Sequence, residues 1–338
     1  MSEPADVMSR ADVEFVPPPR ALLYDVPSLF DGWSHNDPES YAATLDGRAY
    51  LSAAIQGLRN PRLESIAKSR ALHDVSITRA LSSELAETRP VAVMGGHDIA
   101  RNDHAYRLVS ECAAALTRAH FTVLSGGGPG AMEAAHLGAS FANAKPSALN
   151  SALARIASDQ QALKFPLEPN QLVKEGGGFC MESLAALHRW QVPAFAAADG
   201  LDAQPVSIGI PTWLFGHETP TPLAFRHAKY FDNSVREDGL LAVARYGVLY
   251  APGKAGTLQE VFQDAARNYY GAADDLRPMV FLDLDSSWST RFPVKPILDN
   301  LFAGTDKTFL HFVTTVEQVV AAFESHAPKI ERRHLWGV

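Results

Sequence analysis

The sequence predicts an α/β protein with a doubly wound, Rossmann-like parallel sheet, and three observations support this prediction. Short apolar runs rich in β-branched residues alternate with longer stretches of helical periodicity. Glycines directly follow several of these runs, as expected where a strand turns into a helix. The 338 residues, 46% of them hydrophobic, are enough to bury a sizeable core. Because connections between parallel strands are right-handed crossovers, helices should cover both faces of the sheet.

The strand–helix alternation begins at about residue 89. Apolar residues at helical spacing predict the helices between the strands, among them one over residues 222–245 and a closing one from Val316 to Phe323. Asp98 is expected to cap the helix that follows the first strand. Residues 142–200 interrupt the alternation and are predicted to form a helical insertion. The expected strands are 90–94, 121–124, 206–210, 247–251 and 279–282.

The N-terminal part of the chain differs in composition from the rest. Up to about residue 40 it is rich in Pro, Asp and Ser, which favours an irregular arm. Residues 41–87 have helical spacing and are predicted to be a helical N-terminal extension, packed on the main domain or on a second subunit. The predicted division is therefore 1–88 for the arm and extension, and 89–338 for the Rossmann-like domain.

Charge and composition argue against several classes of function. The net charge of −8 disfavours general nucleic-acid binding, which depends on basic surfaces. No apolar run approaches the ~20 residues needed to cross a bilayer, and the N-terminal residues lack the pattern of a signal peptide. We therefore expect a cytoplasmic protein with neither a membrane nor a nucleic acid as partner. The histidines lack recognised metal-ligand spacing, so no metal site is expected.

A first glycine loop, Ser125-Gly126-Gly127-Gly128-Pro129-Gly130, follows the second strand. The first N–H groups of a helix have no partner within the helix and lie at the positive end of its dipole, so Gly127, Gly128 and Gly130 are candidate phosphate contacts. Gly95 and Gly96 should face the same crevice, because ligands collect at the carboxyl ends of parallel strands. The loop has neither the GxGxxG spacing of dinucleotide sites nor the lysine of a P-loop, and a plain tight turn explains it equally well.

A second loop, Pro252-Gly253-Lys254-Ala255-Gly256-Thr257, has the same setting after the strand at 247–251. Every residue of this loop after the proline is a candidate phosphate contact: Gly253, Lys254, Ala255, Gly256 and Thr257. Glu260 follows within one helical turn of Thr257. Phosphate anchors with a carboxylate nearby indicate a site for chemistry on a nucleotide; the alternative for Glu260 is a solvated carboxylate on a helix surface.

These two loops resemble the motifs of one known family. Residues 252–260 resemble PGGxGTxxE, the motif of the Lonely Guy (LOG) family, long described as lysine decarboxylases. The triple-glycine loop, continued by Ala131-Met132-Glu133-Ala134, is similar to the GGGxxGLMGA segment of that family, which adds Met132 to the candidate site. The resemblance covers residues 90–325 and leaves out the N-terminal extension and the insertion.

The resemblance implies a phosphoribohydrolase, which cuts the N-glycosidic bond of a nucleoside 5′-monophosphate such as AMP and releases the base and ribose 5-phosphate. It implies a catalytic pair formed by Glu260 and Arg236, a further substrate contact at Glu218, no cofactor, and a homodimer or higher homo-oligomer with helix 222–245 at its interface. The chemistry suits these residue types, because a fixed carboxylate stabilises positive charge on the ribose ring or orients the attacking water. A guanidinium binds a phosphate through two hydrogen bonds.

Two departures from the family pattern leave an alternative open. Lys254 stands where the motif has its second glycine, and Glu237 stands where the family has a lysine after the arginine. A residue with a side chain at position 254 must adopt an ordinary backbone angle to avoid strain. The alternative function is therefore a non-catalytic protein of the same fold that binds or carries a nucleotide or a molybdenum cofactor.

Overall fold

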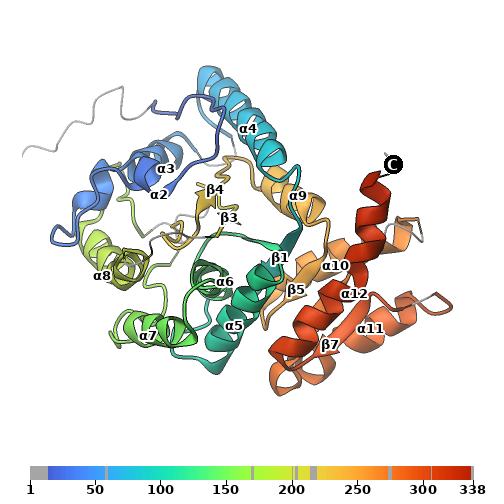
Figure 1. Ribbon diagram of the computed structural model, residues 1–338. Helices are drawn as coiled ribbons and strands as arrows, with labels where there is room; N and C mark the ends of the chain where they lie inside the picture. The colour runs from blue at the N-terminus through green and yellow to red at the C-terminus, as the bar shows by residue number, and fades with distance from the viewer. Residues whose placement is uncertain are drawn as a thin grey trace, which may run out of the picture.

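A seven-stranded, fully parallel sheet is the centre of the molecule (Figure 1). Its strand order, β4-β3-β2-β1-β5-β6-β7, confirms the predicted doubly wound α/β fold. The computed structural model describes residues 14–57, 60–168, 171–199, 201, 205–213, 219–272, 276–305 and 307–335, with side chains up to residue 327. The strands are β1 (Pro90–Met94), β2 (Thr122–Ser125), β3 (Ser207–Gly209), β4 (Arg226–His227), β5 (Val248–Tyr250), β6 (Met279–Leu282) and β7 (Leu310–Val313).

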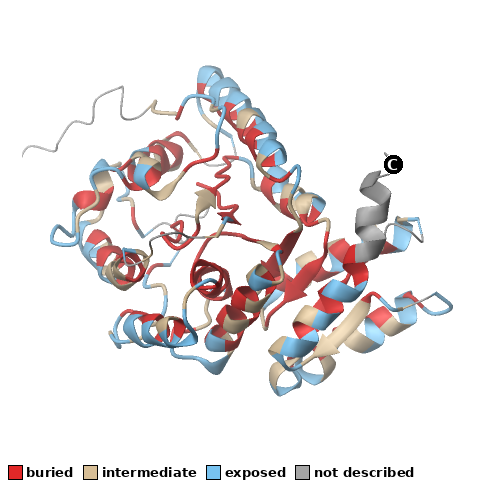
Figure 2. Ribbon diagram, in the orientation of Figure 1, coloured by how far each residue is buried: buried red, intermediate tan, exposed pale blue. Residues whose placement is uncertain are grey.

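Helices cover both faces of the sheet, as the alternating side chains of β1 show. Val91 and Val93 point into a core shared with α5, α6 and α12, whereas Ala92 and Met94 point into a core shared with α4, α9, α10 and α11. The central strands are buried, the edge strand β7 (Leu310–Val313) is of intermediate burial, and the outer helix surfaces are exposed (Figure 2). These helices are α4 (Glu64–Glu84), α5 (His104–Arg118), α6 (Ala131–Ser140), α9 (Asn233–Val243), α10 (Ala255–Tyr270), α11 (Val294–Leu301) and α12 (Val316–Leu335).

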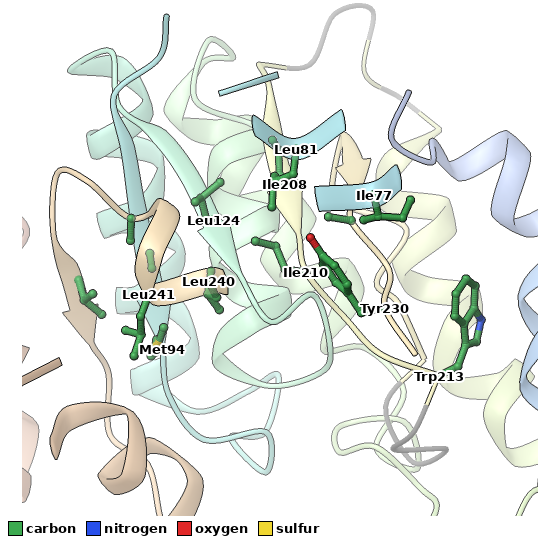
Figure 3. Close-up of a cluster of buried hydrophobic side chains, with 14 of the residues drawn as sticks. Ile77, Leu81, Met94, Leu124, Ile208, Ile210, Trp213, Tyr230, Leu240 and Leu241 are labelled. Atoms are coloured by element: carbon green, nitrogen blue, oxygen red, sulfur yellow. The ribbon is translucent and has the colours of Figure 1, made fainter. Parts of the chain in front are cut away.

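The N-terminal extension packs on the sheet of its own chain. Ile77 and Leu81 of α4 lie beside side chains of the sheet in Figure 3. Asp46 is buried and accepts hydrogen bonds from Tyr41 Oη at 2.7 Å and Trp213 Nε1 at 3.0 Å, besides its ion pair with Lys229. The extension therefore shares one core with the Rossmann-like part. It comprises η1 (Ser40–Ala43), α3 (Leu45–Gln56) and α4. The arm before it was expected to be irregular but contains the short helix α2 (Val26–Phe30), which Asp25 caps by accepting from Ser28 N at 2.9 Å.

The insertion is helical and is tied to the carboxyl edge of the sheet. It contains α7 (Pro146–Ile156) and α8 (Met181–Ala198), and the latter lies beside the N-terminal helices (Figure 1). Arg101, in the loop after β1, donates hydrogen bonds to Ala162 O at 3.2 Å and to Trp190 O at 2.8 Å. A buried arginine thus holds two segments of the insertion against the loop that leaves the first strand.

The structure corrects three of the expected elements. The helix expected over 222–245 begins only at Asn233, because Asp232 caps it by accepting from Ser234 N at 2.8 Å; the residues before it form β4. Asp98 does not cap α5: the N-cap residue is Asp103, and Asp98 pairs with a lysine instead. The closing helix is α12, which extends beyond Phe323 to Leu335. Within the described residues, no helix combines the length and the apolarity needed to cross a membrane.

Candidate functional site

The site lies where the strand order reverses. β1 and β5 are neighbours, and the chain proceeds from β1 to one side of the sheet and from β5 to the other. The loops that leave these strands touch, because Gly96 N donates to Pro252 O at 2.9 Å. A Cβ atom at Gly96 would lie 3.6 Å from the Cα of Gly253. The structure therefore brings Gly95 and Gly96 next to the second glycine loop, and contact of these two glycines with a ligand stays a prediction.

The second loop presents an open helix N-terminus. The first bond along α10 runs from Leu258 N to Lys254 O at 2.9 Å, and no side chain among the described residues caps the helix. The N–H groups of Ala255, Gly256 and Thr257 consequently have no partner within the helix. Gly256 is exposed and Thr257 is buried against Gly253, whose missing Cβ leaves room for the threonine hydroxyl. This geometry suits an anion that approaches from solvent.

The first glycine loop differs from the second because it is buried from Ser125 to Gly130. Gly127 has a φ of 73° and packs against Gly209, and Gly127 N donates to Ser125 Oγ at 3.0 Å. Gly130 has a φ of 67° and lies so close to Gly96 O that a side chain would collide with it. These glycines are explained by close packing, and any phosphate contact at Gly127, Gly128 or Gly130 stays a prediction.

Arg236 reaches this buried loop from α9. The residue is 7% exposed, and its Nε atom has no hydrogen-bond partner among the described residues. A Cβ atom built on Gly126 would lie 3.9 Å from Nη2 of Arg236 and 2.6 Å from Sδ of Met132. A buried guanidinium with an unsatisfied donor is costly, since the group has lost water without gaining a partner. An anionic group that reached Nε would supply that partner.

Glu260 is half-buried on α10, behind the open N-terminus. Burial raises the pKa of the Tyr250 hydroxyl well above its usual range, and the charges of Asp264 and then Glu260 raise it further. Tyr250 donates to Asp264 Oδ2 at 2.9 Å, and burial raises the pKa of Asp264 to about 6. The charge of Glu260 thus acts on Tyr250, the last residue of β5, which the motif alone did not indicate.

The two departures from the family motif have defined partners. Lys254 has a φ of −124°, an ordinary angle for a residue with a side chain, and its Nζ atom pairs with Asp98 Oδ2 at 2.5 Å. Glu237 accepts from Asn233 Nδ2 at 2.7 Å and from Gln259 Nε2 at 3.1 Å. The second contact joins α9 to α10 next to Arg236 and Glu260, and so fixes the two helices that carry the predicted catalytic pair.

A pocket of about 240 Å³ opens beside the second loop and was not predicted from the sequence. The charged residues that line it are Asp98, Asp103, Lys164, Lys254 and Arg291, and Gly253 of the second loop lines it as well. These residues come from four separate segments, so no local motif could indicate the pocket. Glu218, the third residue implied by the family resemblance, lies outside the described residues.

A buried ion pair supports the first helix of the crevice. Arg101 Nη2 lies 2.7 Å from Glu133 Oε1, Arg101 Nε donates to Glu133 Oε2 at 2.8 Å, and Tyr106 Oη donates to the same oxygen at 2.8 Å. Arg101 is 3% exposed and Glu133 is fully buried in the first turn of α6. Both oxygens of Glu133 and all three nitrogens of Arg101 take part in these contacts and those to Ala162 O and Trp190 O, so the pair supports the site rather than forming part of it.

His136, on α6, holds the first residue of the first glycine loop, Ser125, in place through a hydrogen bond. Its Nε2 atom lies 2.8 Å from Ser125 Oγ and its Nδ1 atom 3.0 Å from Ser207 Oγ, so it links β2 to β3. Burial lowers the pKa of His136 to about 3, with a smaller contribution from His227. The imidazole is therefore neutral at physiological pH.

We expect this histidine to make the fold acid-sensitive. In the unfolded chain this histidine takes up a proton at its ordinary pKa of 6.5, whereas in the folded protein it stays neutral down to about pH 3. The free energy of unfolding is therefore unaffected by His136 above pH 6.5 and decreases as the pH drops from there towards 3. Between pH 7 and pH 5 the loss should be about 2 kcal/mol. Urea denaturation at the two pH values should show a correspondingly smaller loss for His136→Asn than for the wild type. An unchanged pH dependence in this variant would contradict the buried, neutral state.

Comparison with known proteins gives likenesses of fold only. No family model and no curated protein matches the chain. Among solved structures it is similar to the molybdenum cofactor binding protein from the phototrophic bacterium Rippkaea orientalis, at 13% identity and a TM-score of 0.41 over 71% of this chain and 98% of that one. It is also similar to TM1055, at 18% identity and a TM-score of 0.41 over 70% and 99% of the two chains.

A third similar structure is the Moco carrier protein from Chlamydomonas reinhardtii, at 16% identity and a TM-score of 0.40 over 72% of this chain and 99% of that one. Likenesses at this level carry no information on activity. The Lonely Guy resemblance accordingly rests on the two sequence motifs alone.

Proposed function

We propose that this protein is a phosphoribohydrolase that cleaves the N-glycosidic bond of a nucleoside 5′-monophosphate, with a purine or purine-derived base. The observation that carries the proposal is Arg236, which is more than nine-tenths buried beside the first glycine loop and whose Nε atom has no hydrogen-bond partner in the described part of the chain. The open N-terminus of α10 supports it with uncapped N–H groups for a phosphate. Glu260 supplies the carboxylate on the same helix.

In this proposal the 5′-phosphate binds the N–H groups from Gly253 to Thr257, and Arg236 pairs with the phosphate or with a carboxylate of the site. The C1′–N bond breaks with its electron pair passing to the base, which leaves positive charge on the ribose ring. Glu260 stabilises that charge and accepts a proton from the water whose oxygen attacks C1′. The base leaves with a proton from solvent, so that one water molecule is consumed for each bond broken.

The test is release of free base from a panel of monophosphates. Purified protein is incubated with AMP, GMP, IMP and CMP, and both the base and ribose 5-phosphate are measured by chromatography. We expect equal amounts of the two products from at least one purine nucleotide. Binding of the nucleotides without any release of base would contradict the hydrolase and favour the alternative, a carrier of a nucleotide or of a molybdenum cofactor.

The carrier is kept as a second candidate because of Lys254. Its ion pair with Asp98 lies at the tip of the loop where the motif has a flexible glycine. A homodimer and a cytoplasmic location remain part of the proposal as predictions from the sequence; light scattering tests the first of them.

A further inference from the structure

The pocket beside the second loop carries positive charge that the proposed function does not use. Three cations line it: Lys254 from the loop, Lys164 from the insertion and Arg291 from the segment between β6 and α11. Lys254 is neutralised by Asp98, at 2.5 Å. Within the described part of the chain, neither Lys164 nor Arg291 forms an ion pair.

The acidic residues of the pocket are already engaged. Asp98 pairs with Lys254, and Asp103 Oδ2 accepts a hydrogen bond from Ala100 N at 2.8 Å. The cations outnumber the acids, so an anion entering the pocket meets a net positive charge. The volume of about 240 Å³ is below the ~300–1,000 Å³ of sites that enclose a whole ligand, which suits one end group of a ligand.

The pocket is continuous with the proposed phosphate site. Gly253 and Lys254 line it and also begin the open N-terminus of α10. The main chain holds the segment that carries Lys164 in place, because Arg101 N donates a hydrogen bond to the carbonyl oxygen of Leu163, the preceding residue, at 2.9 Å. A group attached to a phosphate at the helix N-terminus would therefore have the two unpaired cations within the same opening.

We propose that the pocket binds a second phosphoryl group, so that the ligands of this protein include nucleoside 5′-diphosphates. The proposal rests on the proposed function, since it places the first phosphate at the N-terminus of α10. The α-phosphate binds the N–H groups of the second loop, and the β-phosphate lies between Lys164 and Arg291. A charge-assisted hydrogen bond to an accessible phosphate raises affinity by about tenfold, which sets the expected preference for ADP over AMP.

The test is calorimetric binding of ADP and AMP to the wild type and to the variants Lys164→Ala, Arg291→Ala and their combination. The wild type should bind ADP about tenfold more tightly than AMP, each single variant should reduce this ratio, and the double variant should abolish it. AMP affinity should change by less than about threefold. The preference should also shrink as salt is raised, because the pocket is open to solvent.

Lys68→Ala is the matched control, because Lys68 is an exposed lysine on α4 outside the pocket, paired with Glu64. It should leave the ADP preference unchanged. Equal affinity for ADP and AMP in the wild type, a preference that persists in the double variant, or no binding of either nucleotide would each overturn the proposal. Failure of the proposed function is distinguishable: ADP is then bound preferentially while neither nucleotide releases its base.

Discussion

Glu260→Gln should reduce the rate of base release by about 10²- to 10⁴-fold, equivalent to about 3–5 kcal/mol of activation free energy. The substitution preserves the size of the side chain but removes its negative charge and its ability to accept a proton. Binding of the monophosphate should largely survive, because the phosphate contacts come from the N–H groups of α10 and from Arg236. Steady-state kinetics with the best substrate of the panel measures the first quantity, and calorimetry the second.

Two checks separate this role from a structural one. Glu324→Gln makes the same change at an exposed position of α12, on the opposite face of the sheet, and should leave the rate unaltered. Thermal unfolding of Glu260→Gln shows whether the loss of rate comes from loss of fold. A folded Glu260→Gln protein that retained full release of base would show that another group carries the reaction.

The sequence predicted the parts of the fold that depend on local signals. An apolar run followed by glycines identifies the end of a buried strand, and β1, β2 and β5 end within one residue of the ends of such runs. The shortest strand, β4, was missed because two residues give no periodicity, and its position depends on pairing with β3. Asp103 was missed as the N-cap because Asp98 is equally plausible from sequence; only the partner Lys254 distinguishes them.

The candidate site was predictable only where its residues lie in one segment. The second loop and Glu260 belong to one motif, whereas the pairing of Lys254 with Asp98 joins residues 156 positions apart. The burial of the first loop has a similar cause: Thr221 N donates to Gly127 O at 2.9 Å from a segment far along the chain. A glycine-rich sequence is compatible both with an open anion site and with close packing, and long-range contacts decide between them.

These contacts give the two loops different roles in the proposed mechanism. The second loop is accessible and is the better candidate for the phosphate. The first loop is buried and holds α6 close to the loop after β1, and Arg236 lies beside it at Gly126. The position of α6 then matters for the proposed function, since a displacement of this helix would move the first glycine loop and with it the surroundings of Arg236.

Glu133→Gln should consequently be the most destabilising of the substitutions considered, lowering the free energy of unfolding by about 3–5 kcal/mol. The change leaves Arg101 buried at 3% exposure with its charge uncompensated, although the bonds to Ala162 O and Trp190 O remain. Urea denaturation at neutral pH measures the effect. The double variant Arg101→Met, Glu133→Leu removes both charges and should recover much of the loss, because apolar residues often replace a buried ion pair at little cost.

The matched control is Glu111→Gln, which breaks an exposed pair on α5. Glu111 Oε1 lies 3.7 Å from Arg107 Nη1, and the two side chains are 38% and 45% exposed. Water solvates both charges there, so the substitution should cost less than about 1 kcal/mol. If Glu133→Gln were no more destabilising than Glu111→Gln, the buried pair would not be what holds α6 under the crevice, and the fixed position of Gly126 beside Arg236 would need another cause.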